Sequence, residues 1–235
     1  MRKLGLLLLP FIILSSAYGQ STEFSVHFNS GLFSFGGESA TGSSIIIASD
    51  VSSEGNYTNN PYGTKKKLSY GLTAQFQRIT NYKLIFGLQS GYELLRTQVR
   101  IDDVAGDFPT PPSSASGQTT FKNGFIILYP NVGRRFIFND LNIDLTVGPE
   151  LGFNVVSREK GEATTNNNIV IKTDRERSHA NTDFRLRSSL TVYYKNWGIS
   201  TGYSYGLRNY SGDLIGGNRE RFSRFIRFGV TYRLK

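Results

Sequence analysis

The stretch that decides the fold is "LNIDLTVGPELGFNV", residues 141 to 155, in which apolar and polar residues alternate almost without interruption. Alternation with a period of two places apolar side chains on one face of an extended strand and polar side chains on the other. Strands in globular proteins usually contain about five or six residues, so this one is unusually long. The stretch therefore predicts a long β-strand with one wholly apolar face.

The same alternation recurs along most of the chain. Five further segments show it clearly: residues 68–77, 82–94, 183–195, 197–208 and 225–234. Two segments are less regular, residues 24–32 and 121–138, and the second contains a continuous apolar run from Phe125 to Tyr129 that leaves its register open. Together these segments predict eight strands.

The connections between the predicted strands alternate in length. Tight turns are expected at Thr80-Asn81, Asn139-Asp140 and Asn196, whereas long polar connections occupy residues 37–66, 101–119, 157–180 and 209–220. An even number of strands with short turns at one end and long loops at the other is typical of a membrane-spanning barrel. The sequence thus predicts an all-β fold: an eight-stranded antiparallel up-and-down transmembrane β-barrel with short periplasmic turns and long external loops.

Glycine indicates which face of the strands lines the interior. A soluble barrel would alternate too, with its apolar face inward. A narrow barrel needs small residues inside, whereas a solvent-facing strand surface gains nothing from glycine. On the five most regular glycine-bearing strands, all glycines lie on the polar face: Gly71, Gly87, Gly91, Gly148, Gly152, Gly198, Gly202, Gly206 and Gly229. The apolar face is therefore predicted to meet lipid.

Charges and aromatic residues on the apolar face agree with this assignment. The only charges there are Arg78 and Arg224, both at strand ends, and a charge at the bilayer midplane costs roughly 2–4 kcal/mol. Aromatic residues near the short turns are expected to form an interfacial girdle: Phe76, Tyr82, Phe136, Phe138, Tyr193, Tyr194, Trp197 and Tyr232. Two apolar patches within loops, residues 45–47 and 169–171, are expected to be hairpins that project from the membrane.

The N-terminal segment predicts export. Arg2 and Lys3 precede an apolar run over residues 4–14, which small residues follow; this is the pattern of a signal peptide. The run is shorter than the roughly 20 residues of a membrane-spanning helix. We expect a signal peptide over residues 1–19 and a barrel domain over residues 20–235.

The composition limits the partners. The chain contains no cysteine, and its net charge is +9. Export argues against nucleic acid as a partner, so the basic excess is assigned to attraction for anionic lipid headgroups. No cofactor is expected.

Charged residues on the polar face predict a filled interior. An eight-stranded barrel is just wide enough to be filled by side chains, and buried charges are tolerated only when they are paired. We expect Glu150 to pair with Arg187 or Arg185, in a structural plug rather than a gated ion path. The predicted plug consists of Gln89, Asp144, Glu150, Arg185, Arg187 and Arg227.

Evidence for catalysis is sparse. Lipid A acyltransferases and deacylases of this size use His and Ser with a carboxylate. His27 shares a face with Ser25 and Asn29, and His179 lies near Asp183, but neither shows a recognised spacing. The chain is therefore predicted not to be an enzyme.

A calcium site is also not predicted. Asp102, Asp103 and Asp107 lie close together, but their spacing lacks the Gly and the distal Glu of a calcium loop. No metal site is expected elsewhere.

The last strand resembles the assembly signal of outer-membrane barrels. The resemblance rests on Gly229, Tyr232 and Leu234; it departs from the pattern in having leucine where an aromatic residue is usual, and in the trailing Lys235. The chain as a whole resembles small outer-membrane β-barrels of the OmpA/OmpX-like class. It is also similar to the outer membrane protein beta-barrel domain and to PorT-like proteins of Bacteroidetes-type bacteria. The resemblance implies location in the cell outer membrane and contact with the barrel-assembly machinery.

The function expected from these features is structural or interactive. The barrel would anchor loops that contact the exterior, lipopolysaccharide or an envelope partner, and residues 157–178, which are rich in both signs of charge, are the first choice for a contact surface. Three alternatives remain open: a lipid A-modifying enzyme, a narrow channel, and a PorT-like component of a secretion system.

Overall fold

The computed structural model describes residues 20–49, 55–106, 111–177, 182–212 and 220–234. The expected signal peptide, Asp107, His179 and Lys235 lie outside these residues. The described part of the chain forms eleven strands: β1 (Ser21–Gly36), β2 (Ser43–Ile47), β3 (Tyr57–Thr58), β4 (Lys65–Ile79), β5 (Leu84–Ala105), β6 (Ser113–Phe138), β7 (Leu141–Thr165), β8 (Val170–Glu176), β9 (Thr182–Tyr194), β10 (Trp197–Gly206) and β11 (Phe222–Leu234). Among the described residues, no helix has the length and apolar character needed to cross a membrane.

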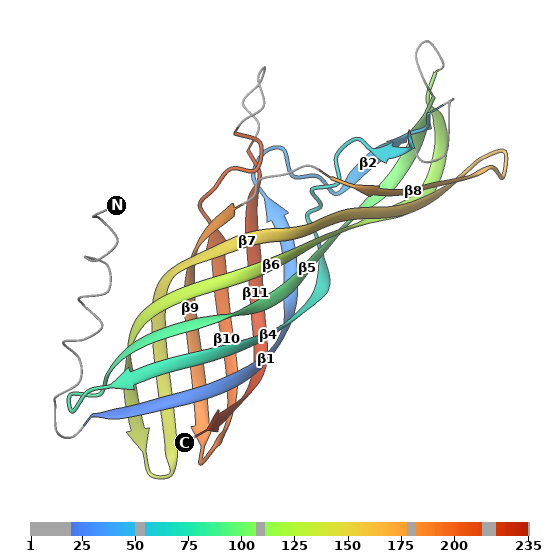
Figure 1. Cartoon of the computed structure of the whole chain (residues 1–235). Coiled ribbons are helices and arrows are strands. Elements are labelled where there is room, and N and C mark those ends of the chain that lie inside the picture. The colour runs from blue at the N-terminus through green and yellow to red at the C-terminus, as the bar shows by residue number, and fades with distance from the viewer. Residues whose placement is uncertain (1–19, 50–54, 107–110, 178–181, 213–219, 235) are drawn as a thin grey trace.

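Eight of the strands in the described residues close into a ring (Figure 1). Each pairs with its neighbours in the order β1, β4, β5, β6, β7, β9, β10, β11, and β11 returns to β1. All of these pairings are antiparallel, so the ring has no unpaired edge. The predicted eight-stranded up-and-down barrel is confirmed.

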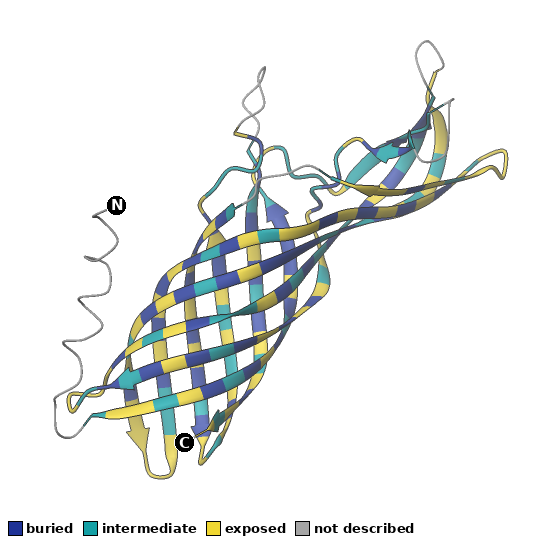
Figure 2. Ribbon diagram, in the orientation of Figure 1, coloured by how far each residue is buried: buried dark blue, intermediate teal, exposed yellow. Residues whose placement is uncertain are grey.

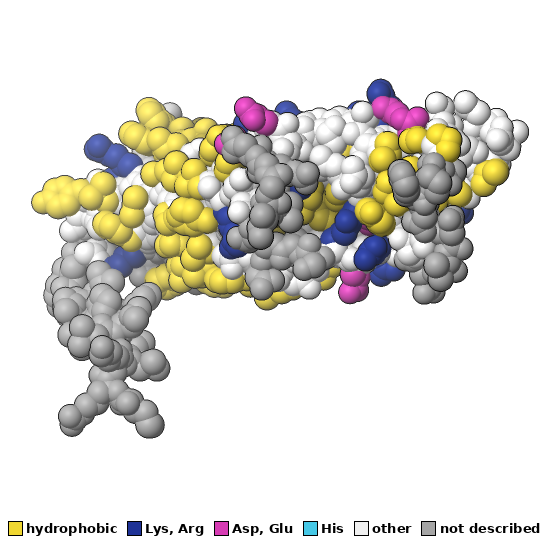
Figure 3. Space-filling model, turned by 90° about the horizontal axis from the view of Figure 1, so that it is seen from above, with side chains coloured by type: hydrophobic (Ala, Val, Ile, Leu, Met, Phe, Trp, Pro, Cys, Tyr) yellow, Lys and Arg dark blue, Asp and Glu magenta, His cyan; other side chains and the backbone are white. Residues whose placement is uncertain are grey.

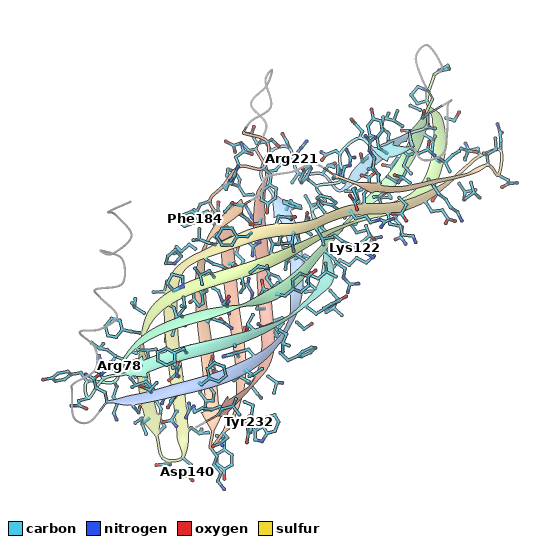
Figure 4. All side chains as sticks on the ribbon, in the orientation of Figure 1. Arg78, Lys122, Asp140, Phe184, Arg221 and Tyr232 are labelled. Atoms are coloured by element: carbon cyan, nitrogen blue, oxygen red, sulfur yellow. The ribbon has the colours of Figure 1, made fainter. Side chains whose placement is uncertain are left out.

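The two ends of the barrel differ as the loop lengths predicted. The turns that follow β4, β6 and β9 are short, and each contains a residue with positive φ: Lys83, Asn139 and Lys195. Figure 4 shows Asp140 and Tyr232 at this end and Arg221 at the opposite end, where the longer connections emerge. The short-turn end is therefore periplasmic and the other end external, as in other barrels of this type.

The outer surface of the ring is apolar. Buried and exposed residues alternate along the ring strands (Figure 2). Leu145, Phe86 and Phe228 are about half exposed on the outside. Gly148 and Gly202 lie close to the adjacent strands, where a Cβ atom would contact their residues. Outward side chains on β5 carry no charge from Leu84 to Leu94, a stretch that fits the roughly 9–11 residues of a spanning strand.

Three ring strands continue beyond the barrel into an arm. The upper parts of β5, β6 and β7 carry β2, β3 and β8 with them, and these six segments are called the arm (Figure 1). Residues 101–119 and 157–180 were expected to be loops, and this was wrong, because most of them are strand. The arm lies beyond the apolar outer surface of the ring, here called the apolar belt, so its outward face is polar. The apolar alternation is therefore lost, and the sequence of the arm resembles that of a loop. Figure 3 shows a broad hydrophobic surface over the barrel, whereas charged side chains of both signs lie among the hydrophobic ones over the arm.

The apolar patch at residues 45–47 is not a projecting hairpin. It forms β2, which runs parallel to β5 and buries Ile46 against Val99, Ile101 and Ala163. These residues give the arm a small core of its own. Residues 169–171 do lie in a hairpin, the one that joins β7 to β8.

Tyr193 was expected in the aromatic girdle, and this was wrong. Its side chain is buried inside the barrel, under the guanidinium of Arg233. Tyr193 and Tyr194 are adjacent, so they point to opposite faces and only Tyr194 is exposed. The other members of the predicted girdle are all exposed on the outside: Phe76, Tyr82, Phe136, Phe138, Tyr194, Trp197 and Tyr232.

Replacing Leu88 with arginine tests the lipid-facing assignment. Leu88 points outward near the middle of the apolar stretch of β5, so Leu88→Arg should lower the free energy of unfolding by roughly 2–4 kcal/mol. Leu84→Arg places the same group on the same strand at the edge of the membrane, where the expected loss is about 0–1 kcal/mol. Denaturant unfolding from lipid vesicles measures both, and equal losses would contradict the assignment.

Candidate functional site: the filled barrel interior

A network of six charged side chains crosses the middle of the barrel. It comprises three carboxylates and three guanidiniums, all buried, and is called the central network: Glu93, Glu150, Asp183, Arg185, Arg187 and Arg227. Its members come from β5, β7, β9 and β11, because inward positions on these strands meet at the same height. The three negative and three positive charges balance.

Glu150 accepts hydrogen bonds from all three arginines. Its Oε1 lies 2.8 Å from Arg185 Nη1 and 2.9 Å from Arg227 Nη2, and its Oε2 lies 3.2 Å from Arg187 Nη1. Arg227 also makes a two-pronged contact with Glu93, with Nε and Nη2 at 2.8 and 2.7 Å from the carboxylate oxygens. Such bidentate charge-assisted bonds fix both partners in direction as well as distance.

Aromatic rings lie against the guanidinium faces of the central network. Arg187 lies over Tyr129 with 4.4 Å between the guanidinium carbon and the ring centre, and Arg227 lies over Phe225 at 4.3 Å. A cation over an aromatic face is attracted by the ring quadrupole, more strongly where water is excluded. The arginines are thus held at their edges by carboxylates and on a face by rings.

A second network closes the periplasmic end, here called the lower network: Glu23, Asp144, Arg135 and Arg233. Arg135 joins two strands by donating to Asp144 Oδ1 at 2.6 Å and to Glu23 Oε1 at 2.6 Å. Arg233, from the last strand, lies 3.0 Å from Glu23. The lower network also has no net charge, and it ties the first and last ring strands to the opposite wall.

Between the two networks lies a small polar cavity of about 20 Å³. Its lining includes His27, Gln75, Gln89, Thr146 and Arg187. This volume fits a single water molecule.

An aromatic layer fills the external end of the barrel. Phe33, Phe35, Phe121, Phe125 and Phe225 pack there with Leu95 and Ile127. Tyr62 and Tyr210 cover this layer from the loops, with ring centres 5.0 and 5.1 Å from that of Phe35. Burial raises the pKa of the Tyr62 hydroxyl. The plug was predicted from polar side chains alone and did not include this layer, which forms because inward positions near the external ends of β1, β6 and β11 carry phenylalanine.

The structure brings four of the six predicted plug residues together: Glu150, Arg185, Arg187 and Arg227. Gln89 lies below them and donates to Thr73 Oγ1 at 2.6 Å. Asp144 belongs to the lower network. The alternatives left open for Glu150 were Arg187 or Arg185, and it contacts both.

Sequence reasoning missed Glu93, Asp183 and most of the lower network. Glu93 lies on the same face of its strand as Gln89 and four residues above it, so a count of inward charges would have found it. Arg135 was missed because the register of residues 121–138 was open. That register is now settled: Phe121, Asn123, Phe125, Ile127, Tyr129, Asn131 and Arg135 are buried within the barrel.

The residues weighed for other chemistry lie in different surroundings. His27 is buried in the interior, 2.9 Å from Ser25 Oγ, so it does not face the membrane. Asp102 is exposed and paired with Arg100 at 2.5 Å. Among the described residues, no group of three His, Cys, Asp or Glu side chains is placed to hold a metal ion.

The assembly-signal residues lie in the last ring strand, β11. Tyr232 and Leu234 point outward near the periplasmic end, where Tyr232 meets the ring of Trp197 at 4.9 Å. Gly229 lies against Asn29 and Ser200 of the neighbouring strands.

Comparison with known proteins shows likeness only at the level of solved structures. No family model matches the chain, and no curated protein matches it. The chain is similar to Ail, the attachment invasion locus protein of Yersinia pestis, in complex with the heparin analogue sucrose octasulfate, with 11% identity over 93% of this chain and 100% of that one and a TM-score of 0.34. It is also similar to Neisserial surface protein A, with 11% identity over 90% and 98% of the two chains and a TM-score of 0.39.

A third similar structure is a deltaS2 mutant of the monoaromatic hydrocarbon channel TodX. Its identity is 9% over 93% of this chain and 90% of that chain, with a TM-score of 0.20. At such values these likenesses carry no argument about residues or activity. The fold rests on the strand pairing and the apolar outer surface described above.

Removing the charge of Glu150 tests whether the central network holds the barrel together. Glu150→Gln leaves three buried guanidiniums with two carboxylates, and breaking a buried ion pair typically costs about 3–5 kcal/mol. We expect a loss of that order in the free energy of unfolding, measured with denaturant in micelles. Glu162→Gln is the control, since Glu162 forms an exposed pair with Lys172 at 3.4 Å and should change little. An equal effect of both changes would contradict the role given to the network.

Proposed function

We propose that the chain is an integral outer-membrane protein whose barrel is a closed anchor and whose arm is its interaction element. The observation that carries this proposal is the combination of an apolar outer surface with an interior occupied at three levels. The lower network, the central network and the aromatic layer each cross the barrel. Two of the three levels are charged and carry no net charge, so neither attracts an ion of one sign.

The arm is built to keep its shape outside the membrane. The β5–β6 and β6–β7 ladders run from the barrel into it. At its centre, the buried Glu159 accepts hydrogen bonds from Thr58 N and Thr173 Oγ1, both at 2.8 Å, and from Arg177 Nε at 2.7 Å. This carboxylate therefore joins β3, β7 and β8, which supports the arm as a rigid contact surface.

The charged stretch of residues 157–178 lies largely on this arm. Its exposed side chains form pairs of opposite charge, Arg158 with Asp174 at 2.5 Å and Lys172 with Glu162 at 3.4 Å. Such a surface suits a protein partner or a glycolipid more than a catalytic site. We propose that the chain is not an enzyme, and the burial of His27 supports this.

Conductance measurement tests the closed-anchor proposal. The wild-type protein in planar bilayers should show no steady conductance. Glu150→Ala should stay closed as well, because the aromatic layer and the lower network still cross the barrel. A steady current through the wild-type protein would favour the narrow-channel alternative. A steady current only in the variant would show that the central network is the sole barrier.

Two further measurements address the remaining alternatives. Unchanged lipid A mass spectra in a deletion strain are expected if the protein does not modify lipid. Co-purification with secretion components from crosslinked envelopes would support a PorT-like role. A partner held by the arm should be lost when the β7–β8 hairpin is shortened, while the barrel still inserts.

A further inference from the structure

A row of cations crosses three strands just above the apolar belt. Arg96 on β5 lies directly opposite Lys122 on β6, and Lys122 lies directly opposite Arg158 on β7. Directly paired residues share one face of a sheet, and the neighbours Leu95, Phe121 and Ser157 are buried, so all three cations point outward. Figure 4 shows Lys122 where the barrel continues into the arm.

Two lysines extend this row into a patch. Lys67 Nζ donates to Thr120 Oγ1 at 2.7 Å, and Lys160 pairs with Thr120 across the β6–β7 ladder. Thr120 lies two residues above Lys122 on the same face. The cationic patch consists of Lys67, Arg96, Lys122, Arg158 and Lys160.

Positive charge in the patch is only partly balanced. Asp174 pairs with Arg158 at 2.5 Å and lies opposite Lys160 in the β7–β8 ladder, and Glu176 lies opposite Arg158, so two carboxylates face five cations. Like charges directly opposite each other destabilise a sheet. Burial, together with repulsion from Arg96 and Lys122, lowers the pKa of Lys67. A bound anion would relieve this repulsion.

The patch meets the apolar belt at a level marked by tyrosines. The outward positions next below Arg96 and Arg158 are Leu94 and Val156. Arg96 lies over the ring of Tyr70 with 5.2 Å to its centre, and the Tyr92 hydroxyl packs against Gly124 beside Lys122. Tyrosines of this kind mark the headgroup level of a membrane, so the cations lie where lipid phosphates lie.

The patch occupies one side of the barrel only. On the opposite wall, the outward side chains at the external ends of β9 and β10 are Phe184, Tyr205 and, just beyond, Leu207. The described residues there include two cations, against five in the patch: Arg224, which lies over the ring of Tyr205, and Arg208, which follows Leu207. This asymmetry distinguishes a localised site from a general excess of positive charge around the rim.

We propose that the cationic patch binds the phosphate group of an anionic lipid in the external leaflet, with Tyr70 and Tyr92 flanking the lipid just below its headgroup. The proposal rests on the membrane placement given under the proposed function. The charge complementarity and the position beside the belt both point to a lipid rather than to a soluble anion.

A local fluorescence probe tests this site. Tyr92→Trp in a Trp197→Phe background places the sole indole beside the patch. The full chain is reconstituted in phosphatidylcholine vesicles that contain brominated phosphatidic acid, and in parallel vesicles in which the phosphatidylcholine is brominated instead. Stronger quenching by the phosphatidic acid is expected at position 92. Trp197 in the otherwise unchanged chain reports from the periplasmic end and should show no such preference.

Charge removal then locates the site. Arg96→Gln with Lys122→Gln should weaken local phosphatidic acid binding by roughly fivefold per cation. Arg100→Gln with Lys172→Gln is the matched control: it removes two cations from the arm outside the patch, each paired with a carboxylate, and should leave the preference unchanged. Raising the salt concentration should reduce the preference.

Four results would overturn the proposal: equal quenching by both lipids, a preference that survives Arg96→Gln with Lys122→Gln, an equal loss in the matched control, or displacement of the lipid by inorganic phosphate at constant ionic strength. Flotation with the vesicles separates these outcomes from failure of the proposed function. A chain that does not float with the vesicles contradicts the membrane placement itself. A chain that floats but shows no preference contradicts only the lipid site.

Discussion

Everything in this structure depends on the narrowness of an eight-stranded ring whose outside is wetted by hydrocarbon. The ring satisfies backbone hydrogen bonds between its own strands, because lipid offers none. Apolar side chains then cover the outside. Because alternate residues of each strand point to opposite faces, the polar side chains point into the interior. In so narrow a space, water cannot solvate them individually. The inward charged side chains of this chain therefore form ion pairs with one another, and both networks carry as many positive as negative groups.

The order of the layers follows from where water is available. The aromatic layer lies at the external mouth, beneath the loops, where it separates the central network from water. The lower network lies at the periplasmic end, where Glu23 and Arg233 are partly accessible. The small polar cavity lies between the two networks, at the level of His27 and Gln89. Under the proposed function, the interior serves stability, and the contacts with other molecules lie on the arm and at its junction with the barrel.

The barrel could be predicted from the sequence because a period of two and a preference for glycine are local signals. The long ribbon at residues 141–155 gave the correct faces as far as Val155. At that point a bulge opposite Gly124 and Phe125 shifts the alternation by one residue. Beyond the bulge the outward face meets water, so Arg158 and Lys160 replace leucine and valine, and the strand no longer resembles a membrane strand. The partners of Glu150 could be predicted by counting residues from the periplasmic end of each strand, which places inward charges at the same level. Arg135 could not be predicted in this way, because a continuous apolar run hides which face of β6 points inward.

One local feature explains why the central network lies where it does. The β6–β7 ladder skips the residues between Leu128 and Val132 on one strand and between Val147 and Leu151 on the other. Pro130 and Pro149 face each other in this gap, and proline has no N–H to donate to the ladder. Gly148 packs directly against the Pro130 carbonyl, so the strands stay close although they are not bonded there. Glu150 lies at the same level, and its bonds to Arg185 and Arg187 of the neighbouring β9 and to Arg227 of the more distant β11 hold β7 in place where its ladder with β6 is interrupted.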